Sequence, residues 1–166
     1  MAKKMMVRVD DRLIHGQVLT QWVSTINAEK IVVIDDEIAK DKMRKNVLKF
    51  AAPAELKISI LSAERAVEIW NKNKFGNFNV FVLFKDVKMI RKCKDLGLTL
   101  PEISLGQMAV TDERKQVYRS LGLTEEEGEV LCTLEKEGVN LYFQMTPTDK
   151  KESLDCIRKT FPALVG

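Results

Sequence analysis

The amino-acid sequence predicts an α/β fold in which helices cover both faces of one open, mainly parallel sheet, within a single domain of residues 1–166. Strand-like and helix-like stretches alternate along the whole chain. Several strand-like stretches are almost continuous in Val, Ile, Leu and Phe, which is typical of strands buried on both faces of a parallel sheet. The connections are short, and no low-complexity linker or internal repeat divides the chain.

Six strands are predicted, over residues 5–9, 30–34, 57–61, 79–84, 102–105 and 139–144. The longest apolar runs, such as VFVLF at 80–84, have the length of a strand and are too short to cross a bilayer. Any role at a membrane is therefore expected to depend on a partner.

The first two helices are predicted from apolar side chains at helical spacing. Over residues 15–26 this stripe consists of Val18, Leu19, Trp22, Val23 and Ile26. A second helix is predicted over 40–51 and ends before Pro53. Its expected core face consists of Met43, Val47, Leu48 and Ala51.

Capping residues predict the other helices. Ser62 is the expected N-cap of a helix over 63–72, and a helix over 86–97 ends in a glycine. Thr124 and Glu127 have the spacing of a capping box for a helix over 125–137. Thr148 is the expected cap of a last helix over 149–160, with Pro162 just beyond its end.

Composition excludes several classes of partner. The net charge is only +3, and basic residues are scattered among acidic ones, so no nucleic-acid partner is expected. The three cysteines are far apart, and one histidine cannot complete a zinc site with them, so no metal is expected. The cysteines are interpreted as buried thiols in a reducing cytosol, and the N-terminal stretch has no apolar signal core, which predicts a cytoplasmic protein.

The histidine loop is the main candidate site. His15 is the only histidine of the chain and lies in VRVDDRLIHGQV, residues 7–18, directly after the first predicted strand. In an open α/β sheet, ligands bind beyond the carboxyl ends of the strands. His15 is also expected near the N-terminus of the first helix, where backbone N–H groups and the helix dipole favour an anion.

The neighbours of His15 suit phosphoryl chemistry. The guanidinium of Arg12 has N–H donors whose geometry matches two phosphate oxygens, and its charge would stabilise the transition state. Asp10 could accept a hydrogen bond from one imidazole nitrogen and leave the other unprotonated and nucleophilic. The rest of the predicted phosphate-binding loop consists of Asp11, Leu13, Ile14, Gly16 and Gln17. The backbone N–H groups of residues 12–17 are expected to complete the anion cradle. Together they predict a site where His15 receives a phosphoryl group.

Other interpretations remain open for the same residues. A lone histidine near a helix start can be a cap, a packing residue or simply exposed, and Arg12 can be a solvated charge. The chain has no dinucleotide fingerprint and no P-loop after a strand, so nucleotide chemistry has no motif to support it. A metal hydrolase would need ligands that are almost all carboxylates. A Cys–His nucleophile pair is compatible with the spacing, but nothing near the cysteines supports it.

The string DDRLIHGQ, with Trp22 after it, resembles the N-terminal signature of the enzyme IIB component of the mannose/fructose/sorbose family of the phosphoenolpyruvate-dependent sugar phosphotransferase system. The resemblance continues through residues 31–53, 80–87 and 103–108 to the C-terminal strand and helix, and so covers essentially the whole chain.

The resemblance implies a cytoplasmic phosphotransferase, peripherally associated with a membrane transporter, that needs no cofactor. The residue matching the family's histidine is His15. It would accept a phosphoryl group from a phosphohistidine of a IIA partner and transfer it to a sugar imported by the membrane components IIC and IID. The identity of the sugar and the oligomeric state, including a possible homo-oligomer, stay open. The IIA partner is expected to dock on a shallow patch that includes the exposed side chains of Arg12 and Leu13.

The chain departs from the family pattern at two places. They are Asp35 and the stretch Ser104–Met108, which includes Gly106 and stands where the family has N-x-G-G-M. These residues form a possible second loop, and Ser104–Met108 is expected beside the His15 loop because ligand loops gather at one edge of the sheet. The departures leave an alternative function open, a regulatory module of the same fold that is phosphorylated but passes the group to no sugar.

Overall fold

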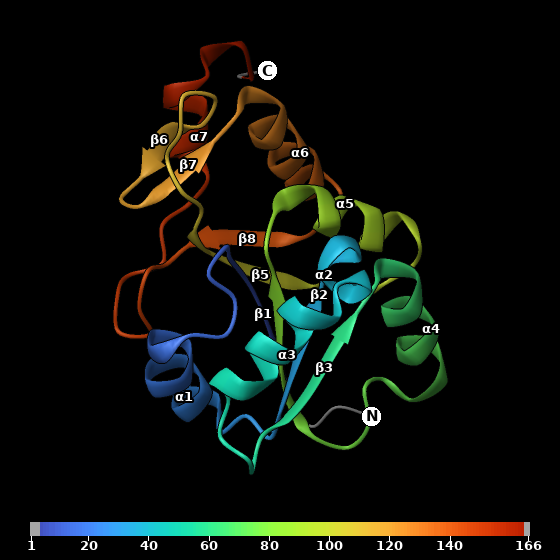
Figure 1. Cartoon of the computed structure of the whole chain (residues 1–166). Coiled ribbons are helices and arrows are strands. Elements are labelled where there is room, and N and C mark those ends of the chain that lie inside the picture. Colours follow the sequence, from blue (N-terminus) through green and yellow to red (C-terminus); the bar gives the residue numbers. More distant parts are fainter. Residues whose placement is uncertain (1–3, 165–166) are drawn as a thin grey trace.

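The computed structural model describes residues 4–164 and contains one six-stranded parallel sheet with the strand order β3-β2-β4-β1-β5-β8 (Figure 1). The predicted α/β fold with an open, mainly parallel sheet is therefore confirmed, and each predicted strand is present. The strands are β1 (Lys4–Asp10), β2 (Lys30–Ile34), β3 (Lys57–Leu61), β4 (Asn79–Phe84), β5 (Glu102–Gln107) and β8 (Asn140–Phe143).

Two apolar cores lie on opposite faces of the sheet. One is covered by α4 (Ala63–Asn73), α5 (Val87–Asp95) and α6 (Glu125–Lys136) (Figure 1). The other contains the first helix and the strand residues Ile31, Val33, Phe81 and Leu83. Because side chains alternate along a strand, Val7 and Val9 of β1 enter the first core, whereas Arg8 and Asp10 point to the face of the first helix. None of the helices within residues 4–164 has the length and hydrophobicity of a transmembrane segment.

Several predicted caps are confirmed by the hydrogen bonds at the helix starts. Ser62 Oγ accepts from the Arg65 amide at 3.2 Å and caps α4. Thr124 and Glu127 form both bonds of the capping box of α6. The glycine predicted to end the helix over 86–97, Gly97, has a φ of 108°, a left-handed conformation that other residues rarely adopt.

The first two helices differ in detail from the prediction. The helix of residues 16–26 contains a π-helical stretch, η1 (Val18–Val23), followed by α1 (Ser24–Ile26). Such wider turns often occur at functional sites. The helix predicted over 40–51 corresponds to α3 (Lys42–Ala51), which begins later because Asp41 is extended and its carboxylate caps α3 through the Arg44 amide. A short helix that the sequence did not predict, α2 (Asp36–Lys40), precedes it.

The predicted core face of the second helix is wrong. Met43 and Val47 are 77% and 63% exposed, and Phe50 on the same helix is 88% exposed. Only Leu48 of the predicted stripe packs against the core. Ile38 of α2 is the buried residue that anchors this region instead.

The C-terminal part also differs from the prediction. Residues 149–154 are not helical, because Glu152 and Phe143 exchange backbone hydrogen bonds of 2.8 and 2.9 Å and hold the chain extended. The last helix, α7 (Asp155–Thr160), therefore begins later, and Thr148 does not cap it. An antiparallel hairpin of β6 (Lys115–Tyr118) and β7 (Leu121–Leu123), which the sequence did not predict, lies between β5 and α6.

Two of the three cysteines predicted to be buried thiols are buried. Cys93 and Cys132 are buried, Cys156 is partly buried, and all three are free. Burial raises the pKa of Cys93 to about 12, so its thiol stays protonated and unreactive at neutral pH.

Candidate functional site

The loop after β1 lies where the connections that follow two neighbouring strands, β1 and β5, lead to helices on opposite faces of the sheet. The first helix, which follows β1, packs on one face, whereas α6, which follows the neighbouring strand β5, packs on the other. The crevice between two such strands is a topological switch point, where open α/β sheets bind ligands. The fold therefore puts residues 11–15 at the expected place for a site.

A tight turn shapes this loop. The Leu13 amide donates to the carbonyl of Asp10 at 3.0 Å, and Leu13 has a φ of 59°. Leu13 and Ile14 are 3% and 4% exposed and pack into the core beneath the first helix. The expectation that Leu13 is an exposed docking residue is wrong, because its side chain anchors the turn. That anchoring leaves Arg12 and His15 on the outer side of the loop.

Asp10 is the centre of the site. It ends β1, is 1% exposed, and accepts three hydrogen bonds of 3.0–3.1 Å from the amide, Nε and Nη2 of Arg12. The Arg12 guanidinium therefore binds both carboxylate oxygens at once, in the bidentate geometry that suits this pair. Its Nη1 donates to Gln17 Oε1 at 2.8 Å. Three of the five guanidinium donors are occupied, and two remain for a further acceptor.

His15 lies against the same carboxylate. Its Nε2 is 3.4 Å from Asp10 Oδ2, and its side chain is 19% exposed. Burial holds the pKa of His15 below its ordinary value, and the nearby Arg12 lowers it further, while Asp10 opposes both. The imidazole is therefore neutral at neutral pH. With Nε2–H directed at Asp10, the unprotonated nitrogen is Nδ1.

The helix start adds backbone donors beside the imidazole. The helix begins at Gly16, and the His15 carbonyl accepts its first bond, from the Leu19 amide at 3.0 Å. The amides of Arg12 and Leu13, expected in the anion cradle, bond to Asp10 instead, so the donors that suit an anion are those of Ile14 to Gln17. A Cβ on Gly16 would meet open space, so the protein's own packing does not require this glycine.

The stretch 104–108 lies beside the histidine loop, as expected from its place at the end of β5. Gln107 pairs with Asp10, and its carbonyl accepts from the Asp11 amide at 2.9 Å. The Asp11 carboxylate accepts from the Ala109 amide at 2.8 Å, so Asp11 ties the two loops together. Asp35 does not join them: it is buried at the end of β2 and caps α2 through the Ile38 amide at 2.9 Å.

Ser104 and Gly106 contact a residue that sequence analysis missed, Arg8. This arginine is 0% exposed and lies behind Asp10 with Nε 3.8 Å from Oδ2. The signal in the sequence was a charged residue inside an apolar strand, two positions before Asp10 and hence on the same face. A fully buried arginine is rare unless it is paired, which marks it for attention.

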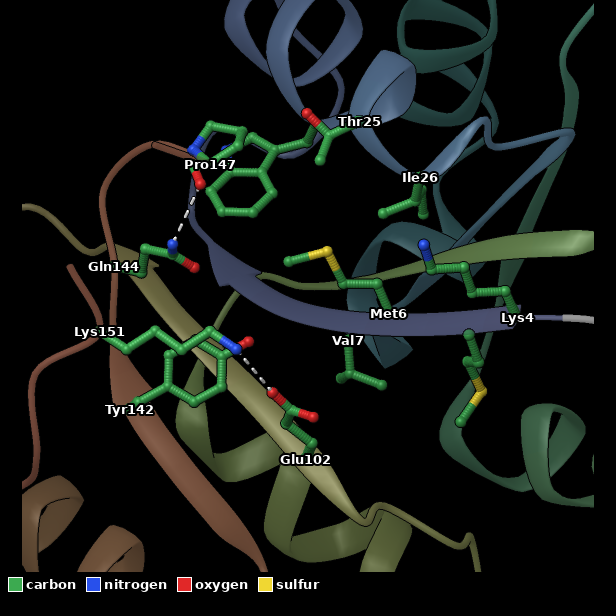
Figure 2. A pocket seen from close by; sticks show the side chains of 12 residues that line it. Lys4, Met6, Val7, Thr25, Ile26, Glu102, Tyr142, Gln144, Pro147 and Lys151 are labelled. Carbon is green, nitrogen blue, oxygen red and sulfur yellow. Dashed lines mark hydrogen bonds and ion pairs between the residues drawn. The ribbon is translucent and has the colours of Figure 1, made fainter. Parts of the chain in front are cut away.

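Next to Arg8, where β1, β5 and β8 run side by side, a hollow opens beside the first helix, whose Trp22, Thr25 and Ile26 form part of its lining. The hollow has a volume of about 270 Å³. Figure 2 shows Met6, Tyr142 and Gln144 pointing into it. Lys151 closes one side: it pairs with Glu102 at 3.4 Å and lies 4.5 Å from the centre of the Tyr142 ring. His15 does not line this hollow.

A second hollow adjoins the histidine loop directly. It holds about 320 Å³ between the loop and the exposed face of α3, with Arg12, Leu13, Met43 and Val47 among its lining residues. Arg44 and Lys85 add positive charge to its rim. An open apolar surface edged by cations therefore borders the histidine loop at Asp11, Arg12 and Leu13.

Comparisons with known proteins agree with this geometry. The family model for the sorbose subfamily IIB component of the phosphotransferase system matches residues 4–161. The chain is 31% identical over 147 residues to the fructose-specific EIIB component of Bacillus subtilis (strain 168), covering 89% of this chain and 90% of that protein. It is 30% identical over 155 residues to the mannose-specific EIIAB component of Escherichia coli (strain K12), covering 93% of this chain and 48% of that protein.

A solved structure gives the same result. The crystal structure of the IIBSor domain of the sorbose permease from Klebsiella pneumoniae matches with a TM-score of 0.87 and 30% identity, covering 95% of this chain and 98% of that one. The family resemblance of the DDRLIHGQ string is thereby confirmed. Because the family model spans nearly all of the described residues, the chain belongs to the sorbose subfamily of phosphotransferase-system IIB components.

Proposed function

We propose that residues 1–166 form one IIB domain that accepts a phosphoryl group on His15 from the phosphohistidine of a IIA partner. The domain then passes the group to a sugar during uptake through membrane IIC and IID components. The observation that carries the proposal is the contact between the neutral, partly exposed imidazole of His15 and the buried Asp10 carboxylate. Both oxygens of this carboxylate accept hydrogen bonds from Arg12. The protein works in the cytoplasm, at the inner side of the transporter.

Nδ1 of His15 is the nucleophile in this proposal. Its lone pair attacks phosphorus while the P–N bond of the donor breaks, and the bonding electrons return to the donor imidazole. Nε2 keeps its proton, and the positive charge that develops on the phosphorylated ring is stabilised by Asp10 at 3.4 Å. In the second step a sugar hydroxyl attacks phosphorus, the P–N electrons return to Nδ1, and the hydroxyl proton leaves to a base in the transporter or to water.

Arg12 and the helix start hold the phosphoryl group. A phosphoryl group on nitrogen carries about two negative charges, whereas a helix N-terminus offers only about half a positive charge. The two free N–H donors of the Arg12 guanidinium and the amides of Ile14 to Gln17 supply the remaining stabilisation. The loose transition state of phosphoryl transfer needs positioning and charge, both of which these groups provide without a metal.

The IIA partner docks on the hollow between the loop and α3. A donor must bring its phosphohistidine into contact with His15, so the surface beside the loop is buried in the complex. Met43 and Val47 supply apolar area, and Arg12, Arg44 and Lys85 complement a partner that carries a phosphoryl group. The EIIAB name of the Escherichia coli relative supports a IIA partner, since it joins the two components in one protein.

The departures from the family pattern do not favour a regulatory module. Ser104 contacts Arg8 behind Asp10, and Asp35 caps a helix, so neither residue touches His15 directly.

The test uses the single histidine. The protein and its His15→Ala variant are incubated with labelled, phosphorylated IIA, with and without sugar and membranes that contain IIC and IID. We expect acid-labile, base-stable label on the wild-type protein, none on the variant, and release of label to sugar only with the membranes. Label on the variant would refute His15 as nucleophile, and label that sugar and membranes never discharge would support the regulatory module.

A further inference from the structure

The guanidinium of Arg8 is fixed in the interior behind Asp10. Nη1 donates to Ser104 Oγ at 3.0 Å and to the Gln144 carbonyl at 2.7 Å, and Nη2 donates to the Met145 carbonyl at 3.0 Å. The group also stacks 4.3 Å from the centre of the Trp22 ring. Residues from β1, β5, the first helix and the chain after β8 thus hold one buried cation in place.

One of its two remaining donors, Nε–H, faces the Asp10 carboxylate. Within residues 4–164, Arg8 Nε is the one buried side-chain nitrogen or oxygen that has no hydrogen-bond partner. It faces Asp10 Oδ2 at 3.8 Å, and the same oxygen lies 3.0 Å from Arg12 Nη2 and 3.4 Å from His15 Nε2. An unpaired buried donor in a native structure needs an explanation. The explanation here is that Arg8 Nε–H attracts the Asp10 carboxylate, which also contacts the His15 imidazole.

We propose that Arg8 is a positioning residue for phosphoryl transfer, whose buried charge holds the Asp10 carboxylate from behind and thereby fixes the His15 imidazole with Nε2–H toward Asp10 and Nδ1 free. This inference rests on the proposed function of His15. Two cations share the negative charge of Asp10, so the carboxylate orients the neutral imidazole without drawing a second proton onto it.

The electrostatics of the cluster agree with this role. Burial lowers the pKa of Arg8 to about 10, against the opposing effects of Asp10 and Tyr142, so Arg8 remains charged at neutral pH. For His15, burial, Arg12 and Arg8 all lower the pKa, and Asp10 raises it. Loss of the Arg8 charge therefore leaves Asp10 to act more strongly on the imidazole.

Arg8 also explains the second loop. Ser104 Oγ is an acceptor for Nη1, and a Cβ added to Gly106 would lie 2.2 Å from Nη2. The serine and the glycine of this divergent stretch therefore belong to the cradle of Arg8. The second loop acts on His15 from behind, through Arg8 and Asp10.

The experiment titrates the only imidazole of the full-length, unphosphorylated protein by NMR, with the ¹⁵N shifts of Nδ1 and Nε2 as a measure of the tautomer. The variants are Arg8→Met, Arg8→Lys and Ser104→Ala. Arg91→Met is the control for loss of an ion-paired arginine, because Arg91 pairs with Asp95 and Glu137 but lies on α5, on the opposite face of the sheet. Transfer from phosphorylated IIA is measured on the same samples.

In Arg8→Met we expect the His15 pKa to rise by about half a unit or more and the tautomer preference to weaken. Transfer at neutral pH should fall by about ten- to a hundredfold, as when a reacting group is misplaced. Arg8→Lys should keep the His15 pKa close to its wild-type value, because the positive charge is retained. Ser104→Ala should raise the His15 pKa less than Arg8→Met does, and Arg91→Met should leave it unchanged.

An unchanged pKa and tautomer in folded Arg8→Met would overturn the inference, however slow the transfer. If that variant does not fold, Arg8→Lys and Ser104→Ala decide, and wild-type pKa, tautomer and transfer in both would overturn it. Failure of the wild-type protein to accept a phosphoryl group would refute the proposed function. The effect of Arg8 on the His15 pKa and tautomer could still be measured, because the titration needs no phosphoryl donor.

Discussion

Replacement of Arg12 by alanine tests the charge balance of the site most directly. The phosphoryl group brings about two negative charges and the helix start compensates about half of one, so the guanidinium is the main opposing charge. We predict that Arg12→Ala slows transfer by a factor on the order of 10² or more, as when other transition-state donors are removed. Arg12→Lys should keep part of the rate, because an ammonium binds one oxygen as a point charge.

The same substitution should also affect stability and the nucleophile. Arg12 donates three hydrogen bonds to the buried Asp10, but its side chain is 32% exposed and solvent screens the pair. Even in Arg12→Ala the residue keeps its backbone amide bond, so we expect a loss of about 1–2 kcal/mol in the free energy of unfolding. The His15 pKa should rise, because Arg12 lowers it in the native protein.

The assay is the initial rate of label transfer from phosphorylated IIA, with denaturant unfolding measured on the same samples. Arg65→Ala is the control, since Arg65 is an exposed arginine that pairs with Glu68 on α4, over the other core. A rate for Arg12→Ala within about threefold of both wild type and the control would refute the reasoning. It would mean that the backbone donors of the helix start suffice and that Arg12 serves only to hold Asp10.

Three further predictions concern pH, packing and docking. Because the folded His15 pKa lies below its ordinary value of about 6.5, the unfolded chain binds the proton more readily, and the free energy of unfolding should fall as the pH drops below about 6.5. Gly106→Ala should destabilise the fold by about 1–3 kcal/mol in urea unfolding, because its Cβ would collide with the Arg8 guanidinium. The double substitution Met43→Ser, Val47→Ser should weaken binding of IIA about tenfold or more in calorimetry, with little change in stability, since both side chains are exposed in the free protein.

Each of these predictions has its own control. His15→Gln should have a flatter pH profile of stability than wild type, and identical profiles would contradict the assigned pKa shift. Gly16→Ala, where a Cβ meets open space, should cost far less stability than Gly106→Ala. Leu96→Ser removes an exposed apolar side chain just after α5 and should leave IIA binding unchanged. Equal binding by the α3 double variant and wild type would place the partner elsewhere.

Elements with a strong local signal were predictable from the sequence. Buried strands such as residues 79–84 are continuous apolar runs, and Thr124 with Glu127 marks a helix start by bonds that span only three residues. The hairpin of β6 and β7 was missed because strands of four and three residues are too short to show a period. The stretch 149–154 was assigned to a helix because its long-range bridge to Phe143 leaves no local trace.

The amino-acid sequence by itself determined the parallel α/β class, the order of the elements, and the position of His15 in the loop between the first strand and the first helix. These depend on periodicity, capping and the rule that ligand loops lie at the carboxyl ends of strands, all of which are short-range or general. Only the tertiary structure decided that Met43 and Val47 stay exposed, since a helix pattern does not say whether another element covers it. Only the tertiary structure placed Arg8 behind Asp10, because its partners Ser104 and Gln144 are 96 and 136 residues away along the chain and meet it through the order of the strands in the sheet.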